Sequence, residues 1–306
     1  MKIFREHRTF DEVAIPFLEE KEIELSYKTF IGYRTKVNAL SIWLTKKRIN
    51  HLPIHKITSQ MMSEFFIYLS REKDLDKPTV EKYFVHLRKM WRFAKKRSWV
   101  DSEPFDLIVF PQKKRDCGAE VIPIDKLRVL LTEIQKKDPQ LFLACMIQYY
   151  CFIRPGRELR SMKVGDIDFD RGVIRISYLT AKSKRDDSIT MPQQLIDICQ
   201  EQGLDKIDKT LFIFGHKRIP GQKSVSENML RYRFNKYRDM FNLGIGIKLY
   251  SFKHTGATML HQCGTASMRD IMDHLRHTRL EATQHYIKKH GGVINERIRV
   301  GFPSPI

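Results

Sequence analysis

The apolar residues between positions 9 and 110 recur at three- and four-residue steps, and this period stops after residue 110. Such spacing is typical of amphipathic α-helices that turn one face toward a core. Residues 111 to 120 instead combine proline, glycine and charged side chains, which is typical of a linker. A chain of 306 residues is also long enough for two cores. The sequence therefore predicts a helical domain over residues 1–112, a linker over 113–120 and a second domain over 121–306.

The last helical segment of the first domain, from Pro78 to about Arg97, has the clearest division between an apolar and a polar face. At about 100° per residue, five basic side chains fall within an arc of about 120° opposite the apolar stripe. These are Lys82, His86, Lys89, Arg92 and Lys96. A solvated helix face usually mixes both signs of charge, but this arc contains no acidic residue. We therefore predict that these side chains contact DNA phosphates.

The whole chain carries a large excess of positive charge, with 55 Lys plus Arg against 36 Asp plus Glu and a net charge of +19. Its isoelectric point is about 9.7. A surplus of this size favours a polyanionic partner, because binding to phosphates releases counterions. A basic protein that is merely kept soluble by its charge is the less favoured alternative. The expected partner is double-stranded DNA.

The cysteines and the apolar runs indicate where the protein works. The five cysteines are odd in number and lack paired metal-ligand spacing, so we expect free thiols in a reducing compartment, with no metal and no cofactor. The first residues lack the apolar core of a signal peptide. The longest apolar run, residues 141–153, is interrupted by Gln148 and is too short to span a membrane. These features predict a soluble cytoplasmic protein.

The second domain is predicted to combine helices with a small sheet. Asp138 and Pro139 form an N-cap and a first-turn proline that begin an apolar helix ending near Ile153. Alternating residues predict strands at 173–177 and 188–191, with Lys182 or the neighbouring Lys184 at the hairpin tip. A later helix, residues 226–241, is expected to present a second cationic surface made of Arg231, Arg233, Lys236 and Arg238. The predicted fold class is mainly α with a small β-sheet (α+β).

Near the C-terminus, His277 and Tyr286 lie nine residues apart in Leu275-Arg-His-Thr-Arg-Leu-Glu-Ala-Thr-Gln-His-Tyr286. Nine residues make two and a half helical turns, so one continuous helix would place the two side chains on opposite faces. They can converge only if the chain turns between them, with His277 at the end of one helix and Tyr286 on the next. A phenol is a poor nucleophile unless a base removes its proton and cations stabilise the charge that develops at its target.

Six residues, taken in chain order, resemble the active-site series of the tyrosine recombinases, the phage integrase family. They are Arg154, Lys182, Tyr250, Lys253, His277 and Tyr286. The family pattern is Arg, a Lys on a β-hairpin, His-x-x-Arg, Leu-Gly-His and a Tyr nine residues after that His, and four of the six positions match in type. The resemblance implies a helical core-binding domain, a linker and a mixed catalytic domain, which together form a clamp around DNA.

The chain departs from the family pattern at two motifs, and one position has two candidates. His-x-x-Arg appears as Tyr250-x-x-Lys253, and the glycine before His277 is replaced by Arg276. A lysine cannot bind two phosphate oxygens as arginine does, so His254 and backbone amides are candidates to assist it. The first family arginine is either Arg154, which we favour, or Arg157. Glu158 is expected to orient a catalytic cation.

The resemblance implies an activity and its partners. A site-specific recombinase or integrase of a prokaryotic mobile element would cleave and rejoin DNA through a 3′-phosphotyrosine intermediate, without ATP or a metal. In such a mechanism Tyr286 attacks the phosphate, Arg154 and Lys253 hold it, Lys182 protonates the leaving oxygen, and His277 binds the phosphate or assists deprotonation. The enzyme would act as a tetramer on DNA, with possible accessory DNA-bending or directionality proteins. Relaxation of supercoils in the manner of type IB topoisomerases, or DNA binding without catalysis, are the alternatives.

Overall fold

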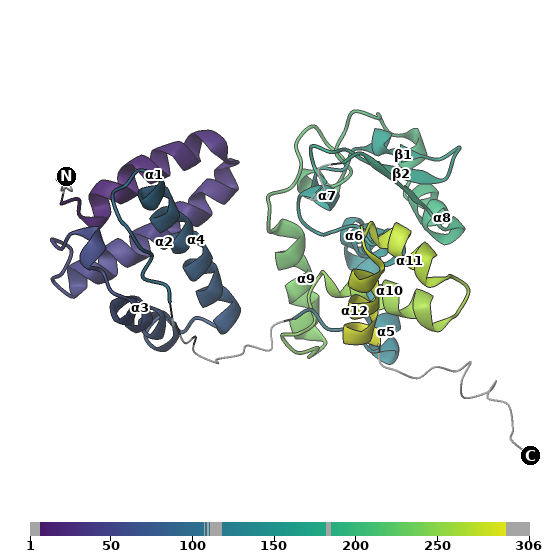
Figure 1. Ribbon diagram of the computed structural model, residues 1–306. Coiled ribbons are helices and arrows are strands. Elements are labelled where there is room, and N and C mark those ends of the chain that lie inside the picture. The colour runs from purple at the N-terminus through teal and green to yellow at the C-terminus, as the bar shows by residue number, and fades with distance from the viewer. Residues whose placement is uncertain (1–6, 107, 109, 111–117, 182–184, 292–306) are drawn as a thin grey trace, which may run out of the picture. The chain divides into compact units, whose positions relative to one another are not determined.

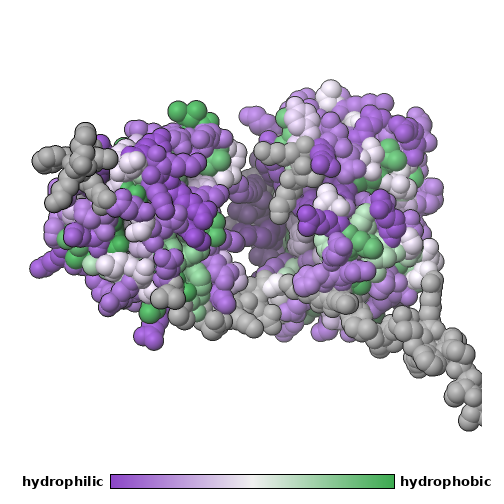
Figure 2. All heavy atoms as spheres, in the orientation of Figure 1, coloured by the Kyte–Doolittle hydropathy of each residue, from purple (hydrophilic) through white to green (hydrophobic). Residues whose placement is uncertain are grey.

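The computed structural model describes residues 7–106, 108, 110, 118–181 and 185–291, and divides the chain into two compact units, Met1–Asp116 and Cys117–Ile306 (Figure 1). Each unit has its own hydrophobic core. Hydrophilic side chains dominate the visible face of both (Figure 2). The described chain is mostly helical and contains one small antiparallel sheet, which confirms the predicted fold class. Most of the predicted linker, residues 113–117, lies outside the described residues.

The N-terminal unit consists of helices that begin where the sequence places capping side chains. Its helices are α1 (Phe10–Glu24), α2 (Tyr27–Lys46), α3 (Ser59–Arg71) and α4 (Lys77–Lys96), with a short 3₁₀ turn at Ile54–Lys56. The Asp76 carboxylate accepts a hydrogen bond from the backbone N–H of Thr79 at 3.1 Å, and the Thr58 hydroxyl accepts one from Met61 at 3.3 Å. These bonds satisfy amides that have no partner inside the first helical turn.

Apolar side chains from all four of these helices form one core. The packing is rich in aromatic edge-to-face contacts, such as Trp43 against Phe65, whose ring centroids lie 5.6 Å apart. The predicted stripes supply most of the buried side chains, including Phe10, Val13, Phe17, Val37, Leu40, Phe65, Phe66, Leu69, Val80, Leu87 and Trp91. Burial of these stripes fixes which face of α4 remains toward solvent.

The C-terminal unit is built around helix α6 (Pro139–Cys151), which is buried along nearly its whole length. It contacts α5 (Ile124–Lys137), α8 (Gln193–Glu201), α9 (Met229–Met240) and α10 (Ser251–Gln262). The other helices of the unit are α7 (Arg157–Arg160), α11 (Met268–Leu275) and α12 (Leu280–Gly291), with 3₁₀ turns at Val164–Asp166, Leu204–Lys206 and His216–Arg218. A helix that is apolar on all sides must be covered by other elements in this way.

The sheet has three antiparallel strands in the order β1 (Ile167–Asp168), β2 (Val173–Ile176) and β3 (Asp187–Thr190). Ile174 pairs with Ile167 on one side and with Ile189 on the other, so one face of the sheet turns these isoleucines into the core. The tip of the β2–β3 hairpin, residues 182–184, lies outside the described residues. The predicted positions of Lys182 and Lys184 therefore remain predictions.

Helix α10 lies against both α6 and α12, and the contact with α6 is unusually close. A Cβ atom added to Gly256 would lie 1.9 Å from the carbonyl oxygen of Tyr149. No residue larger than glycine fits there without moving one of the two helices. Gly256 thus fixes the distance between the central helix and the helix that carries Lys253 and His254.

One expectation about α9 is wrong. Arg233, predicted on a cationic surface, is only 8% exposed, and its guanidinium forms an ion pair with the buried carboxylate of Asp138. It also donates a hydrogen bond to the Gln140 side chain at 2.8 Å. Asp138 thus caps α6 and binds α9 at the same time, and a buried carboxylate of this kind requires such a partner.

Two further observations concern expectations drawn from the sequence. Cys145, Cys151 and Cys199 are free and buried, and Cys263 is free and exposed. None of the helices among the described residues combines the length and the apolar character that crossing a membrane requires.

Candidate active site

The phenol of Tyr286 makes a short contact with a histidine from another helix. Its oxygen lies 2.5 Å from His254 Nδ1, and the two ring centroids are 5.0 Å apart. His254 is on α10 and Tyr286 is on α12, which pack against each other. In the tautomer with its hydrogen on Nε2, His254 accepts a hydrogen bond from the phenol and is placed to take its proton.

His277 lies in the short connection between α11 and α12, as its spacing from Tyr286 predicted. Its ring centroid is 5.8 Å from that of Tyr286, and its Nδ1 is 2.9 Å from the Thr283 hydroxyl, which fixes the ring orientation. Partial burial and the positive charges of Lys253, Arg154 and Arg276 lower the pKa of His277. The ring is therefore neutral at pH 7 and can either donate or accept a hydrogen bond.

The environment of Tyr286 keeps its phenol protonated in the resting state. Burial raises the pKa of Tyr286 above its usual range, and the neighbouring Tyr250 raises it further, while the charge of Arg154 acts in the opposite direction. A phenol with a raised pKa is a nucleophile only if a base accepts its proton during attack. The contact with His254 supplies a base at the required distance.

Arg154 lies three residues after the end of α6 and is held by an acidic residue on the next short helix. Its Nη1 donates a hydrogen bond to Glu158 Oε1 at 2.8 Å, and its backbone N–H donates to Oε2 at 3.3 Å. The Arg154 side chain remains 25% exposed, whereas that of Glu158 is 3% exposed. This geometry leaves part of an oriented guanidinium available to an anion. Arg157 is exposed at the start of α7.

Tyr250 and Lys253 lie at the N-terminal end of α10, close to this arginine. Burial raises the pKa of Tyr250, and the charge and hydrogen bond of Arg154 oppose that effect. The Tyr250 ring packs edge-on against His254 with centroids 4.7 Å apart. Lys253 is 1% exposed, so its ammonium group lies inside the site and not on the surface.

The structure brings together five of the six predicted catalytic residues, namely Arg154, Tyr250, Lys253, His277 and Tyr286. The sixth, Lys182, lies outside the described residues. Sequence reasoning considered His254 only as an aid in phosphate binding, and assigned no role to Arg276. The position of His254 beside Lys253 was a usable signal, but its partner is 32 residues away along the chain. Among the described residues no cluster of His, Cys, Asp or Glu could hold a metal ion.

The predicted DNA-binding face of α4 is largely open to solvent. Lys82, Lys89, Arg92 and Lys96 are exposed. His86 differs, because its half-buried ring lies 4.2 Å from the ring of Tyr33 and burial lowers its pKa. Arg92 forms an ion pair with Glu103 at 3.3 Å, an acidic neighbour that the helix periodicity could not reveal. Lysines therefore contribute most of the unpaired positive charge of this face.

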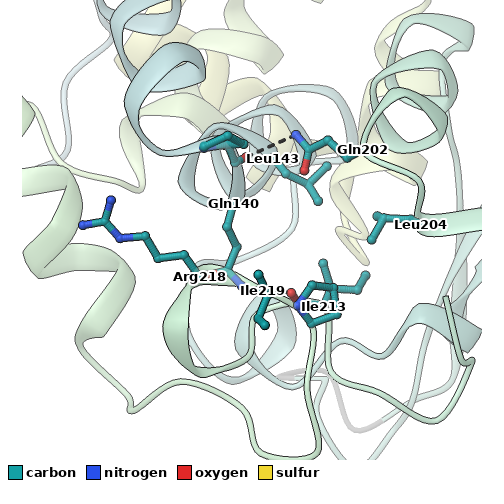
Figure 3. A pocket seen from close by; sticks show the side chains of 9 residues that line it. Gln140, Leu143, Gln202, Leu204, Ile213, Arg218 and Ile219 are labelled. Atoms are coloured by element: carbon teal, nitrogen blue, oxygen red, sulfur yellow. Dashed lines mark hydrogen bonds between the residues drawn. The ribbon is translucent and has the colours of Figure 1, made fainter.

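A pocket in the C-terminal unit lies apart from these residues (Figure 3). Its walls are mainly apolar, with Leu143, Leu204, Ile213 and Ile219 around the opening. Gln202 closes one side by donating a hydrogen bond to the carbonyl oxygen of Pro139 at 3.2 Å. Neither His254 nor Tyr286 lines this pocket, so it is a separate feature from the candidate active site.

Comparison with known proteins identifies the family of both units. Residues 9–114 match the phage integrase SAM-like domain, and residues 120–291 match the phage integrase family. The chain is 23% identical over 282 residues to the tyrosine recombinase XerC of Oceanobacillus iheyensis, which covers 88% of this chain and 89% of the relative. It is 21% identical over 304 residues to XerC of Leptospira interrogans serogroup Icterohaemorrhagiae serovar copenhageni. This alignment covers 96% of this chain and 94% of the relative.

Solved structures share the fold. The Tn1549 transposon integrase in complex with a circular intermediate DNA aligns with a TM-score of 0.74 at 15% identity, covering 96% of this chain and 98% of that one. A lambda integrase dimer bound to a COC′ core site aligns with a TM-score of 0.75 at 15% identity, and the alignment covers 94% of this chain and 79% of that one. A lambda integrase tetramer bound to a Holliday junction aligns with a TM-score of 0.72 at 15% identity, and the alignment covers 92% of this chain and 77% of that one. With family matches that span both units, the chain belongs to the phage integrase family of tyrosine recombinases.

Proposed function

We propose that the protein is a site-specific DNA recombinase that cleaves and rejoins strands through a 3′-phosphotyrosine intermediate. The observation that carries the proposal is the 2.5 Å contact between the Tyr286 oxygen and His254 Nδ1. A nucleophile beside a base, close to a guanidinium and a buried ammonium group, has the parts that phosphoryl transfer to a tyrosine needs. The family to which the chain belongs supports the same reaction.

In the proposed reaction the Tyr286 oxygen forms a bond to a DNA phosphorus, and the bond from that phosphorus to the 5′ oxygen breaks. The phenolic proton passes to His254, and the leaving 5′ oxygen takes a proton from Lys182, which gives a free 5′-hydroxyl. Arg154 and Lys253 hold the non-bridging oxygens, and neutral His277 donates a hydrogen bond to one of them. Religation is the reverse of these steps, so the protein–DNA ester retains the bond energy.

Tyr250 stands where the family pattern has histidine, and we assign it a supporting role. A phenol can donate a hydrogen bond to phosphate, but its raised pKa makes it a weak proton acceptor. His254, one helical turn further along α10, takes over proton acceptance in this proposal. Arg154 is assigned as the first family arginine because Glu158 orients it beside Tyr250, whereas Arg157 points to solvent.

We further propose that both units bind the same duplex, with boundaries at 1–112 and 121–306 and a linker over 113–120. A duplex is a rod about 20 Å across, and two domains joined by a linker can each contact it, whereas one compact domain cannot surround it. The lambda integrase tetramer on a Holliday junction supports assembly of four copies on DNA, with the tail beyond Gly291 as one candidate contact between subunits. Action within a prokaryotic mobile element, in the cytoplasm and with DNA-bending or directionality proteins, is part of the same proposal.

A nicked suicide substrate tests the reaction. Strand cleavage beside the nick releases a short oligonucleotide that diffuses away, so the covalent intermediate accumulates. We expect a protein–DNA adduct that resists denaturant, with the modified peptide carrying Tyr286.

Because Tyr250 and Lys253 depart from the family pattern, a DNA-binding protein without catalysis is the main alternative. Tight binding to the substrate without any adduct would establish this alternative and refute the proposal. Relaxation of a supercoiled plasmid without strand exchange would favour the topoisomerase alternative.

The exposed lysines of α4 give a separate prediction about affinity. Replacing Lys82, Lys89 and Lys96 by glutamine should weaken duplex binding at least about 10-fold and lower the salt dependence by about 0.9 per lost phosphate contact. Fluorescence anisotropy over a range of salt concentrations measures both effects. The matched control replaces Lys47, Lys56 and Lys73, which are exposed elsewhere in the same unit. An equal loss in that control would show that only net charge matters and that α4 has no special position on DNA.

A further inference from the structure

Arg276 has a backbone conformation that an arginine rarely adopts. It follows the last residue of α11 with a φ of +58°, in the left-handed region. Glycine is the common residue at such a helix end, and other L-residues are disfavoured there by about 1–2 kcal/mol. The family pattern has glycine at this position, directly before the histidine. Arg276 therefore has a backbone strain that glycine at the same position would not have.

The side chain of Arg276 is buried against the acidic residue that orients Arg154. Its Nη2 donates a hydrogen bond to Glu158 Oε2 at 2.7 Å, and both side chains are only 3% exposed. The other carboxylate oxygen of Glu158 accepts from Arg154 at 2.8 Å. One carboxylate thus joins two guanidinium groups from separate elements of the fold. Arg154 and Glu158 alone would have no net charge, and Arg276 restores one positive charge to the group.

Several features of Arg276 are unfavourable for the stability of the folded chain. Nε and Nη1 of Arg276 are buried and have no hydrogen-bond partner among the described residues. Buried donors without partners are unfavourable, and so is the left-handed backbone. Glu158 would retain its bond to Arg154 if Arg276 were absent, so removal of Arg276 leaves no isolated buried carboxylate.

A function in catalysis explains this arrangement. The chain has Lys253 where the family pattern has its second arginine, so one guanidinium is missing from α10. Arg276 brings a guanidinium to the same region from the end of α11. Arg276 and Arg154 bind the two oxygens of the same carboxylate, and the positive charges of Lys253, Arg154 and Arg276 each lower the pKa of the His277 ring.

We propose that Arg276 is a positioning residue that binds Glu158, so that Arg154 keeps its orientation and its positive charge for the scissile phosphate. Arg276 thereby compensates for the lysine at position 253. The inference rests on the proposed recombinase function. It assigns to Arg276 an effect on the rate of cleavage and not on the affinity for DNA, because the guanidinium acts through another side chain.

The test measures the adduct rate on a nicked suicide substrate at saturating DNA, together with duplex affinity by anisotropy. Arg276→Gly should slow adduct formation about 100-fold, the usual effect of losing one preset donor or charge at an anionic transition state. Duplex affinity should stay within about 3-fold, because the guanidinium is buried and binds Glu158. Arg269→Ala, which removes an exposed arginine of α11, is the matched control and should cleave at the wild-type rate.

A second variant tests the charge balance directly. In Glu158→Gln/Arg276→Gly the carboxylate is gone, so Arg154 no longer needs a second guanidinium to remain positive, and glutamine can still accept its hydrogen bond. This double variant should cleave at least about 10-fold faster than Arg276→Gly alone. Wild-type cleavage by Arg276→Gly, or a double variant no faster than the single one, would overturn the role of Arg276. Failure of the wild-type protein to form any adduct would instead overturn the proposed function.

Discussion

Tyr286→Phe is expected to abolish covalent attachment to DNA, with a loss of at least about 10⁴-fold in the adduct rate. The substitution removes one oxygen atom, the proposed nucleophile, and leaves the ring that packs near Ile287 and Leu275. Duplex affinity should change by less than about 3-fold, since binding energy comes mainly from phosphate contacts elsewhere. The measurement is the amount of denaturant-resistant adduct on a nicked substrate, with anisotropy on the intact duplex.

Tyr250→Phe is the matched control, because it removes a second phenol from the same site. Tyr250 lies beside His254, yet the proposal gives it no bond to DNA phosphorus. We expect this variant to form adduct, with a rate lowered by about 10-fold at most for one lost hydrogen bond. Adduct formation by Tyr286→Phe together with its absence in Tyr250→Phe would mean that the nucleophile is Tyr250 and that our assignment is wrong.

Gly256→Ala should destabilise the C-terminal unit by about 3 kcal/mol, which corresponds to roughly 6–12 °C in unfolding temperature for a domain of this size. The added methyl group would meet the Tyr149 carbonyl oxygen at 1.9 Å and the Phe152 ring at 3.1 Å. Backbone atoms cannot move aside as a flexible side chain does, so α10 must shift away from α6. Because α10 carries Lys253 and His254, its displacement should also lower the rate of adduct formation.

Gly32→Ala provides the comparison within a helix of the other unit. A Cβ atom there meets only the Lys36 ammonium group at 3.9 Å, so the methyl group has room. Alanine has the higher helix propensity, and we expect a gain of about 0.5–1 kcal/mol. Calorimetry or circular dichroism resolves both changes. An unchanged unfolding temperature in Gly256→Ala would show that the two helices can separate without loss, contrary to the packing described here.

The helices were predictable because local sequence determines them. Thr58 caps α3 just before its apolar stripe starts, and the helix predicted from Pro78 begins one residue earlier, at Lys77, after the capping residue Asp76. Helix α6 was predictable for the same reason, since Asp138 and Pro139 precede a continuous apolar run. Hydrophobic period and capping chemistry are short-range signals, and both survive in a single sequence.

The partners of charged side chains were not predictable in this way. Arg233 was expected on a cationic surface with the other basic residues of its helix, but its carboxylate partner Asp138 is 95 residues away along the chain. The same limit applies to His254, whose contact with Tyr286 depends on how α10 and α12 pack. The nine-residue spacing of His277 and Tyr286 did reveal that a turn must separate them, and α11 ends just before His277. Local geometry could be predicted from the sequence, whereas contacts between side chains far apart along the chain could not.

The carboxylate of Glu158, which binds Arg154 and Arg276 together, has a consequence for recognising active members of this family. Compared with the family motifs one position at a time, Lys253 and Arg276 are two separate departures. Scored as one set around the shared carboxylate, the same residues keep two guanidinium groups, one on Arg154 and one on Arg276. When integrases are sorted into active and inactive members, charged side chains that lie close together in the fold should therefore be considered as one group. An arginine missing from one helix can be replaced by an arginine at the end of another helix.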